Sequence, residues 1–274
     1  MRYLAFEGTV DTEIGVIDGD LVRPLTTLDA FYADPDTWRA TEPLTDPIPL
    51  DQLVQVPPVP PTAQIMCLGL NYQAHIDEVG RDRPPAPNLF ARWYATLVCD
   101  GAEIPVPSGE PGLDWECELA VIIGAEMTDV AEADAMAGVL GYTCFNDVSA
   151  RTHQRATPQW ALGKNATNSG PIGPWVVTAD ELGDPYNRRI ETRYNGDTMQ
   201  SSTTGHMIFS IAETIAYATR CITLRPGDVI ATGTPSGVGS KMDPPVFMGP
   251  GDRIEVEVEG IGVLTNHIVG PVGS

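Results

Sequence analysis

Asp114-Trp-Glu-Cys-Glu-Leu-Ala-Val-Ile-Ile-Gly124 is the stretch that decides the fold and points to the chemistry. Alternate side chains of a strand point to the same face, so its apolar residues form one face and Glu116 and Glu118 share the other. Two carboxylates this close repel each other unless a cation, a proton or an arginine compensates them. The stretch therefore predicts a strand that presents a pair of acidic side chains.

A second strand-like run, Gly141 to Ala150, contains Asp147 among residues that are compatible with turns. If the two runs lie side by side, Asp147 can bring a third carboxylate to Glu116 and Glu118. Oxygen ligands of this kind suit a hard divalent ion such as Mg2+, Mn2+ or Ca2+, with water or substrate at the remaining positions. The pattern is compatible with a metal site, and the alternative is solvated carboxylates on an exposed strand face.

The composition is that of a soluble globular protein. A chain of 274 residues holds one large domain, or one large and one small domain. The formal net charge of -21 and the pI near 4.3 argue against binding to nucleic acid or to an anionic membrane, because both need clustered Lys and Arg. No run of about 18 apolar residues is present and the first residues lack a signal-peptide pattern, so we expect a cytoplasmic protein.

The five cysteines, at positions 67, 99, 117, 144 and 221, are odd in number and widely scattered. They have no Cys-x-x-Cys spacing, and most stand inside apolar runs. We therefore expect buried free thiols in a reducing compartment, and the spacing implies neither zinc ligands nor disulfides.

A proline-rich stretch between Pro43 and Pro61, which can form neither a helix nor a central strand, divides the chain. Before it, alternating apolar residues around an Asp18-Gly19 turn predict β-strands. After it come short strands between Gly, Pro and Asp turns. We predict a small N-terminal β-rich domain with its linker at residues 1–61, and a catalytic domain at residues 62–274. Helices are expected near residues 72–79, 132–139 and 207–220.

The segment from Gly69 to Gly80 predicts a short helix with Asn71 as its N-cap and Gly80 as its stop. His75 and Glu78 are three residues apart and therefore neighbours on one helical face. A carboxylate beside an imidazole fixes its tautomer and stabilises its charged form, which makes the histidine a competent general base toward water. The alternative is an ordinary surface pair.

Lysine is rare in this chain, because only Lys164 and Lys241 occur among the 16 basic residues. Arginine is a planar fork, whereas lysine is a compact charge whose pKa shifts readily on burial. Lys164 is therefore a candidate for a chemical role, with compositional drift as the alternative.

Five ordered blocks make the sequence resemble the fumarylacetoacetate hydrolase family across nearly all of residues 62–269. The blocks are Gly-Leu-Asn-Tyr-x-x-His-x-x-Glu at 69–78, Asp-Trp-Glu-Cys-Glu-Leu-Ala-Val-Ile-Ile-Gly at 114–124, Gly-Tyr-Thr-Cys-Phe-Asn-Asp-Val-Ser-Ala-Arg at 141–151, Gln-Trp-x-x-Gly-Lys at 159–164 and Pro-Gly-Asp-Val-Ile-Ala-Thr-Gly-Thr-Pro-Ser-Gly-Val-Gly at 226–239. The resemblance implies a mixed α/β, β-rich fold, with a β-roll or β-sandwich catalytic domain that usually forms a homodimer.

The resemblance also implies the composition of the site. Its residues would be the metal ligands Glu116, Glu118 and Asp147, the catalytic residues His75, Glu78 and Lys164, and the ligand contacts Gln154 and Thr234. Mg2+ is the expected ion, with Mn2+ or Ca2+ as alternatives. The implied activity is hydrolysis of a carbon–carbon bond in an acylpyruvate-like or other β-diketo acid through a metal-bound enolate, with a His–Glu dyad activating water.

Two other activities remain open at this point. One is an oxaloacetate-type decarboxylase or keto–enol isomerase that uses the same metal and enolate, and the other is a non-catalytic relative that binds a metal or ligand. In each case the partner would be a small keto acid or diketone.

Two segments depart from the pattern of the family. The run Phe90-Ala-Arg-Trp-Tyr94 is bulkier and more aromatic than usual. Arg92 is a candidate substrate-binding residue, while Trp93 and Tyr94 either line a pocket for a larger substrate or belong to the core. Residues 165–170 replace the usual Ser and Phe, so no pocket contact is carried over there.

Overall fold

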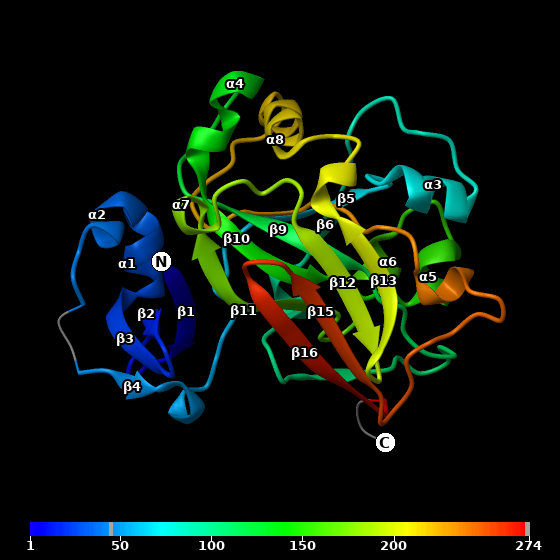
Figure 1. Ribbon diagram of the computed structural model, residues 1–274, viewed down its shortest axis with the longest axis horizontal. Helices are drawn as coiled ribbons and strands as arrows, with labels where there is room; N and C mark the ends of the chain where they lie inside the picture. The colour runs from blue at the N-terminus through cyan, green and yellow to red at the C-terminus, as the bar shows by residue number, and fades with distance from the viewer. Residues whose placement is uncertain (44–45, 272–274) are drawn as a thin grey trace.

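The computed structural model describes residues 1–43 and 46–271, and its strands form two sheets (Figure 1). The larger sheet has eleven strands within the described residues. Its order is β4 (Ile48–Pro49), β3 (Leu21–Thr27), β2 (Thr12–Asp18), β1 (Arg2–Glu7), β11 (Gly170–Thr178), β10 (Val139–Asn146), β9 (Cys117–Ile123), β14 (Val229–Ala231), β5 (Ile65–Gly69) and β6 (Asn88–Arg92), with β7 (Leu97–Val98) beside β11.

The smaller sheet lies against the larger one and has five strands in the described part of the chain. These are, in order, β13 (Asp197–Thr203), β12 (Arg189–Tyr194), β15 (Arg253–Val258), β16 (Gly262–Val269) and β8 (Glu103–Pro105). On β15 the apolar residues are buried, and Glu255 and Glu257 form ion pairs with arginines of the same sheet. The expected mixed α/β, β-rich architecture is thereby confirmed.

The helices are short and lie at the periphery of the sheets. They are α1 (Leu28–Ala33), α2 (Pro35–Arg39), α3 (Gln73–Val79), α4 (Glu132–Ala135), α5 (Arg151–Arg155), α6 (Ala161–Lys164), α7 (Ala179–Leu182) and α8 (Ile211–Thr219). Single 3-10 turns occur at η1 (Leu50–Gln52), η2 (Tyr94–Thr96), η3 (Met136–Gly138), η4 (Thr204–His206) and η5 (Gly239–Lys241). Within the described residues, no helix combines the length and apolar character that a membrane crossing requires.

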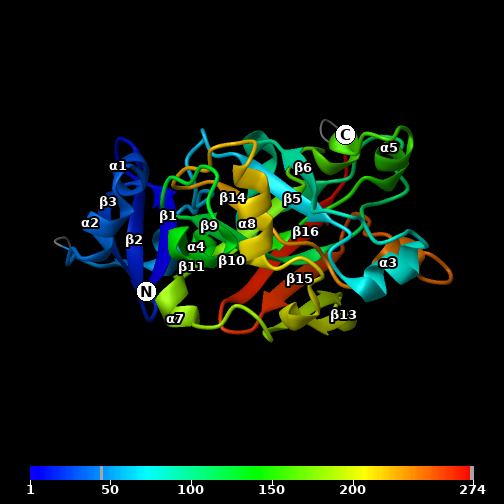
Figure 2. The same ribbon diagram turned by 90° about the horizontal axis from the view of Figure 1, so that it is seen from above.

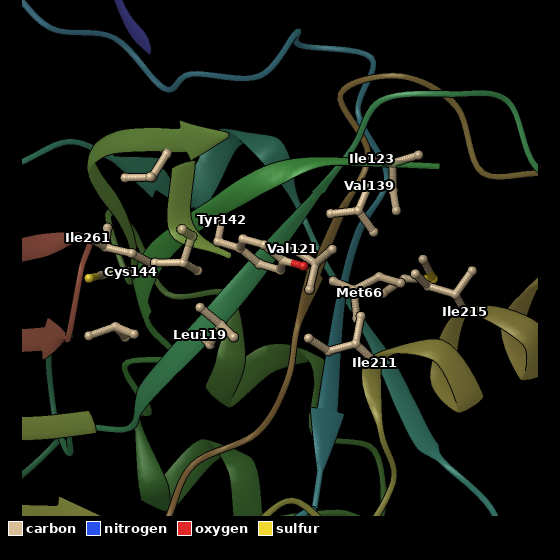
Figure 3. Packing of buried hydrophobic residues seen from close by; sticks show 14 of the residues in the cluster. Met66, Leu119, Val121, Ile123, Val139, Tyr142, Cys144, Ile211, Ile215 and Ile261 are labelled. Carbon is tan, nitrogen blue, oxygen red and sulfur yellow. The ribbon is translucent and has the colours of Figure 1, made fainter. Parts of the chain in front are cut away.

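Strand β9 lies at the centre of the core, and all seven of its residues are buried. Its odd-numbered residues pack against Tyr142 and Cys144 of β10 and against Ile211 and Ile215 of α8 (Figure 3). Its even-numbered apolar residues, Ala120 and Ile122, belong to a second cluster that extends toward the N-terminal strands. The predicted alternation is therefore real, but both faces are covered, and the acidic side chains lie in the interior instead of on a wet face.

The predicted helices exist with different boundaries. The one expected at 207–220 begins at Ile211, because the Ser210 side chain accepts a hydrogen bond from the Glu213 N–H at 3.0 Å and caps it. The one expected at 132–139 is α4 continued by η3. Helix α3 ends at Gly80, whose φ of 66° is the left-handed conformation of a C-terminal stop, as predicted.

The first strands continue the large sheet, because β1 pairs antiparallel with β11. Strands β2 and β3 form the expected hairpin, in which Asp18 pairs with Leu21 across the turn. The proline-rich stretch contributes the edge strand β4 and the turn η1, and its residues 44 and 45 lie outside the described residues. The domain boundary at residue 61 stays a prediction.

The two views place the N-terminal strands at one end of the molecule and helices α3 and α5 at the other (Figures 1 and 2). The loop between β14 and β15, drawn in orange, lies at the same end as α3 and α5. This end therefore gathers segments from three distant parts of the chain around the start of β9 and the end of β10.

Candidate active site

The three predicted carboxylates converge where β9 begins and β10 ends. Cys117 pairs with Asn146, and the Asp147 N–H donates to the Glu116 carbonyl at 2.9 Å, so the residues flanking the pair are neighbours. One carboxylate oxygen from each of Glu116, Glu118 and Asp147 lies within 4.8 Å of the others. All three residues are buried. The strand register thus builds a compact acidic triad.

Two members of the triad are neutralised by basic side chains. Lys164 Nζ lies 2.8 Å from Glu116 Oε2 and 2.5 Å from Asp147 Oδ2. Arg151 pairs with Glu116 Oε1 at 2.7 Å, and Arg92 pairs with Asp147 Oδ1 at 2.7 Å. Burial alone would raise the pKa of Glu116, but Lys164 and Arg151 outweigh it and lower that pKa to about 2. Burial alone would lower the pKa of Lys164, but the carboxylates of Asp147 and Glu116 outweigh this effect and raise that pKa.

Glu118 lacks such a partner. It accepts a hydrogen bond from the Gly233 N–H at 2.8 Å and forms no ion pair within the described residues. Burial first, and then repulsion from Asp147 and Glu116, raise its pKa well above the usual range. Ionised Glu118 therefore needs additional positive charge.

Charge and donor chemistry both fit a divalent cation. Asp114, which pairs with Arg151 at 2.7 Å, adds a fourth buried carboxylate to the three of the triad. The basic groups that face them are Lys164, Arg151 and Arg92, so one negative charge is left when all seven groups are ionised. The nearby Tyr72 hydroxyl is buried without a hydrogen-bond partner among the described residues, and Glu118 contributes to its raised pKa after burial. An oxygen-only donor set of this kind suits Mg2+ or Mn2+.

His75 and Glu78 form the predicted pair, but inside the protein. His75 Nδ1 lies 3.0 Å from Glu78 Oε2, and Glu78 Oε1 accepts a hydrogen bond from the Gly237 N–H at 2.8 Å. Because His75 is only 7% exposed, the surface-pair alternative does not hold. The hydrogen bond from the Gly237 N–H to Glu78 links α3 to the loop that follows β14.

Asn71 has another role than the predicted N-cap. The residue at the N-cap is Tyr72, which makes no side-chain capping bond. The Asn71 amide donates to the carbonyls of Phe209 and Thr232 at 3.1 and 2.8 Å, and its oxygen accepts from the Phe209 N–H at 2.8 Å. Buried amides form such bonds because an unpaired polar group in the interior is costly. Asn71 thus ties the start of α3 to two other segments.

A cavity of about 650 Å³ opens over the triad. Its lining brings together the predicted site residues His75, Glu116, Glu118, Asp147, Gln154, Lys164 and Thr234. Gln154 accepts a hydrogen bond from Arg151 at 2.8 Å, and the Thr234 hydroxyl accepts one from Gln200 at 2.9 Å. Glu78 supports the wall from behind His75.

Arg92 does not line this cavity, contrary to the prediction that it binds substrate. Its guanidinium is buried and donates to Asp147, to the Ser169 hydroxyl at 2.9 Å and to the Val148 carbonyl at 2.8 Å. With its donors used in this way, Arg92 positions Asp147.

The aromatic lining also differs from the expectation. Trp93 is 56% exposed and Tyr94 packs against the second core cluster, so neither lines the cavity over the triad. Phe90 and Trp160 do, with ring centroids 5.4 Å apart in an edge-to-face arrangement. Phe90 also lies 5.5 Å from Lys164 Nζ, which places an aromatic face beside the ammonium group.

Four basic residues in the lining were not predicted to belong to the site, namely Arg81, Arg151, Arg155 and Lys241. Arg151 ends one of the sequence blocks quoted above and could have been recognised as a partner of the acidic strand. Lys241 is the second of only two lysines, so the rarity that singled out Lys164 could have drawn attention to it as well. Arg81 and Arg155 lie on an exposed loop and at a helix end, where the local sequence has no distinguishing pattern.

Asp114 was also overlooked as a site residue. It is fully buried and accepts hydrogen bonds from the Arg151 side chain and from the N–H groups of Gly239 and Ser240, at 2.7, 2.7 and 3.1 Å. One carboxylate therefore fixes both Arg151 and the turn η5 against the start of β9.

The sequence and the fold of this chain are similar to those of known proteins. The family model described as fumarylacetoacetate (FAA) hydrolase C-terminal matches residues 64–269. The mitochondrial oxaloacetate tautomerase Fahd2a of Rattus norvegicus is 40% identical over 223 residues, which cover 81% of this chain and 71% of that protein.

Two solved structures cover nearly the whole chain. The 2-hydroxyhepta-2,4-diene-1,7-dioate isomerase from Mycobacterium marinum has a TM-score of 0.82 and 29% identity, with 100% of both chains covered. Maleylpyruvate hydrolase from Sphingobium sp. SYK-6, in complex with manganese(II) and pyruvate, has a TM-score of 0.79 and 29% identity, with 99% of this chain and 100% of that chain covered.

Proposed function

Because the chain belongs to the fumarylacetoacetate hydrolase family, we propose that it is a divalent-metal-dependent enzyme that hydrolyses a carbon–carbon bond in an acylpyruvate-type 2,4-dioxo acid. The observation that carries this proposal is the pair of buried His75 and half-buried Glu78, whose Nδ1 and Oε2 atoms are 3.0 Å apart, with His75 on the wall of the cavity that holds the acidic triad. A histidine paired with a carboxylate is a general base for water.

Glu116, Glu118 and Asp147 would hold the ion, which supplies Lewis acidity to the oxygens of a 2-oxo acid when it is bound. Mg2+ is the first choice and Mn2+ the second, because both accept oxygen-only ligands. The manganese in the maleylpyruvate hydrolase structure supports an ion of this class.

The hydrogen bonds of the dyad define its proton chemistry. A carboxylate can only accept, so His75 Nδ1 carries the proton that is donated to Glu78 Oε2, and Nε2 is free to accept another. In the proposed reaction His75 takes a proton from water, and the resulting hydroxide adds to the C4 carbonyl of the substrate. The C3–C4 bond then breaks, its electron pair stays on the pyruvate fragment, and the proton on His75 returns to C3.

The pyruvate fragment gains negative charge as that bond breaks. Lys164 is 2% exposed and Arg151 is 7% exposed, and both line the cavity beside the triad. Positive groups held in a site that is largely closed to water stabilise developing charge without having to reorganise. We assign Lys164 and Arg151 to this role, with Gln154 and Thr234 as contacts to the substrate.

The test is turnover of acylpyruvates, fumarylpyruvate and oxaloacetate by the purified protein, with Mg2+ or Mn2+ and again with EDTA, followed by NMR. Release of pyruvate and the matching carboxylic acid only when the ion is present is the expected result. Absence of pyruvate from every acylpyruvate would contradict the proposal.

A second candidate is interconversion of the keto and enol forms of an oxaloacetate-like acid. The 40% identity to an oxaloacetate tautomerase favours it. In this reaction one base moves a proton between C3 and the C2 oxygen, and no water is activated. The decay of enol-oxaloacetate absorbance without loss of any carbon fragment would identify this activity, whereas release of CO2 would identify decarboxylation.

We also propose a reducing compartment such as the cytoplasm. All five cysteines are free thiols, and four of them are buried. Burial raises the pKa of the Cys67 and Cys117 thiols, which keeps them unreactive. The homodimer remains a prediction.

A further inference from the structure

Helix α5 supplies three residues of the cavity lining, namely Arg151, Gln154 and Arg155. The helix has only five residues, and a helix this short has little stability of its own. Its N-cap residue is Ala150, whose methyl group cannot accept a hydrogen bond. The direction in which α5 presents its side chains to the cavity therefore depends on contacts from other segments.

Glu110, in the loop before β9, supplies the capping bonds that Ala150 cannot form. Its Oε2 accepts a hydrogen bond from the Thr152 N–H at 3.3 Å, and its Oε1 accepts one from the His153 N–H at 3.1 Å. The His153 ring adds a third contact, because its Nδ1 lies 2.5 Å from Glu110 Oε1. The first N–H groups of a helix have no partner within the helix, and a carboxylate suits them. One side chain from outside α5 thus fixes its first turn.

The carboxylate of Glu110 is fully used by these contacts. The Glu110 side chain is 0% exposed, whereas that of His153 is 40% exposed. Burial alone would raise the pKa of Glu110, but the hydrogen bonds from His153 and Thr152 outweigh burial and lower that pKa. Glu110 is not among the described residues that line the cavity over the triad. Its ionised side chain therefore holds α5 from the side away from the cavity.

The other contacts of α5 transmit its placement to the site. Asp114, four residues after Glu110, pairs with Arg151 at 2.7 Å, and Arg151 donates to Gln154 Oε1 at 2.8 Å. On the side of α6, a Cβ on Gly163 would overlap the backbone of Gln154, so the two helices are in direct contact. A shift of the first turn of α5 would therefore move Arg151 and Gln154 relative to the triad.

We propose that Glu110 is a positioning residue for the reaction, which orients Arg151 and Gln154 toward the substrate by holding the first turn of α5. The proposal rests on the proposed function for the roles of Arg151 and Gln154. Groups that contact a substrate act only in the right geometry, and a displacement of about 1 Å can lower the rate about 100-fold. Removing Glu110 alters where these groups lie and leaves their chemistry unchanged.

Two variants test the assignment through kcat/KM for an acylpyruvate. E110A removes all three contacts with α5, and we expect a loss of about 10- to 100-fold. E110Q keeps a carbonyl oxygen that can accept from the same N–H groups, so its loss should stay below about threefold. The control is E103A, which removes an exposed carboxylate at the start of β8, outside the cavity lining, and should match wild type.

Calorimetry separates positioning from a general loss of structure. Arg151 pairs with Glu116, one of the three proposed metal ligands, so a displaced α5 should leave the Mn2+ affinity unchanged or higher. Pyruvate, a product of the proposed reaction, should bind about tenfold more weakly to Mn2+-loaded E110A than to Mn2+-loaded wild type. A parallel loss of Mn2+ and pyruvate binding, or wild-type pyruvate binding in E110A, would overturn the proposal.

The same measurements distinguish this inference from the proposed function. If no acylpyruvate is hydrolysed, but E110A weakens pyruvate binding and E110Q restores it, the proposed reaction is wrong and the role of Glu110 is supported. If wild type, E110A and E103A hydrolyse acylpyruvates equally well, the proposed reaction is supported and the role of Glu110 is wrong.

Discussion

Replacing Glu118 with Gln is expected to stabilise the protein when no divalent ion is bound. Glu118 is buried, accepts a single hydrogen bond from Gly233 and forms no ion pair among the described residues, whereas Glu116 and Asp147 each touch two basic groups. Its charge is therefore the least compensated in the site. The amide oxygen of Gln can keep the bond to Gly233 while the charge is removed.

The size of the effect follows from the separations within the triad. With ligand oxygens within 4.8 Å of one another and an effective dielectric constant of about 20, each neighbouring carboxylate repels Glu118 by about 3.5 kcal/mol. Lys164 and the two arginines offset much of this repulsion. We expect E118Q to raise the free energy of unfolding at pH 8 by about 1–3 kcal/mol, which corresponds to about 2–5 °C in melting temperature for a chain of this size.

The dependence on pH has a definite sign. Folding raises the pKa of Glu118 through burial and repulsion from its neighbours, so the folded protein binds this proton more tightly than the unfolded chain, in which a glutamate has a pKa of about 4.3. The destabilisation is absent below that pH and grows as the pH rises above it. The advantage of E118Q should therefore be large at pH 8 and small near pH 4.

The assay is thermal unfolding in EDTA and with increasing Mg2+, at pH 5 and pH 8. Glu126→Gln removes an exposed carboxylate after β9 and serves as the matched control. Mg2+ should stabilise wild type and E126Q more than E118Q, because the variant has lost a charged ligand. The reasoning would be refuted if E118Q melted at a lower temperature than wild type in EDTA at pH 8 and if Mg2+ stabilised E118Q as much as it stabilises wild type.

Four further outcomes are expected. H75N should lower the hydrolytic kcat by about 10²–10⁴-fold while Mn2+ affinity measured by calorimetry is retained, and a matching loss of Mn2+ binding would argue against a base. K164M should lower the free energy of unfolding in EDTA by about 3–5 kcal/mol, because Glu116 and Asp147 each lose a cation; urea titration measures this, and a change below about 1 kcal/mol would contradict it. The pKa of Glu116 is lowered to about 2 in the folded protein, so ionised Glu116 stabilises the fold above the unfolded pKa of about 4.3, and this stabilisation is lost as the pH falls toward 2. The free energy of unfolding, measured by urea titration, should therefore fall more steeply between pH 5 and pH 3 for wild type than for E116Q. Dialysis against EDTA should abolish turnover, and Mg2+ or Mn2+ should restore it, as pyruvate release would report.

Period-two alternation was enough to predict the shared face of Glu116 and Glu118, because side-chain direction along a strand is a local property. It could not show that this face is buried, since the covering segments come from elsewhere in the chain. The placement of Asp147 depends on the pairing of Cys117 with Asn146. The family resemblance implied that the three carboxylates share one site, but neither it nor the alternation specified this register.

Asn71 and Arg92 show where local rules fail. Asparagine is a residue type that favours the N-cap of a helix, yet the Asn71 amide donates hydrogen bonds to the carbonyls of Phe209 and Thr232, which are 138 and 161 residues away in the sequence. Arg92 was assigned to the substrate because it departs from the family pattern, but Asp147, 55 residues later, accepts its hydrogen bond. A local pattern cannot identify a partner that only the tertiary fold brings into contact.

The distribution of charge explains how so acidic a protein can accept an anionic substrate. The buried residues around the triad include four carboxylates and three cations. They therefore do not favour a substrate carboxylate until a further cation offsets the charge of Glu118. Arg155 and Lys241 are exposed residues of the cavity lining that form no ion pair within the described chain. They attract an anion whether or not a cation is bound at the triad. At low ionic strength such cations raise the rate of encounter, and screening over about 8 Å at physiological salt reduces this effect. An anionic substrate is therefore attracted first by the exposed cations, and the buried residues around the triad favour its carboxylate once a cation offsets Glu118.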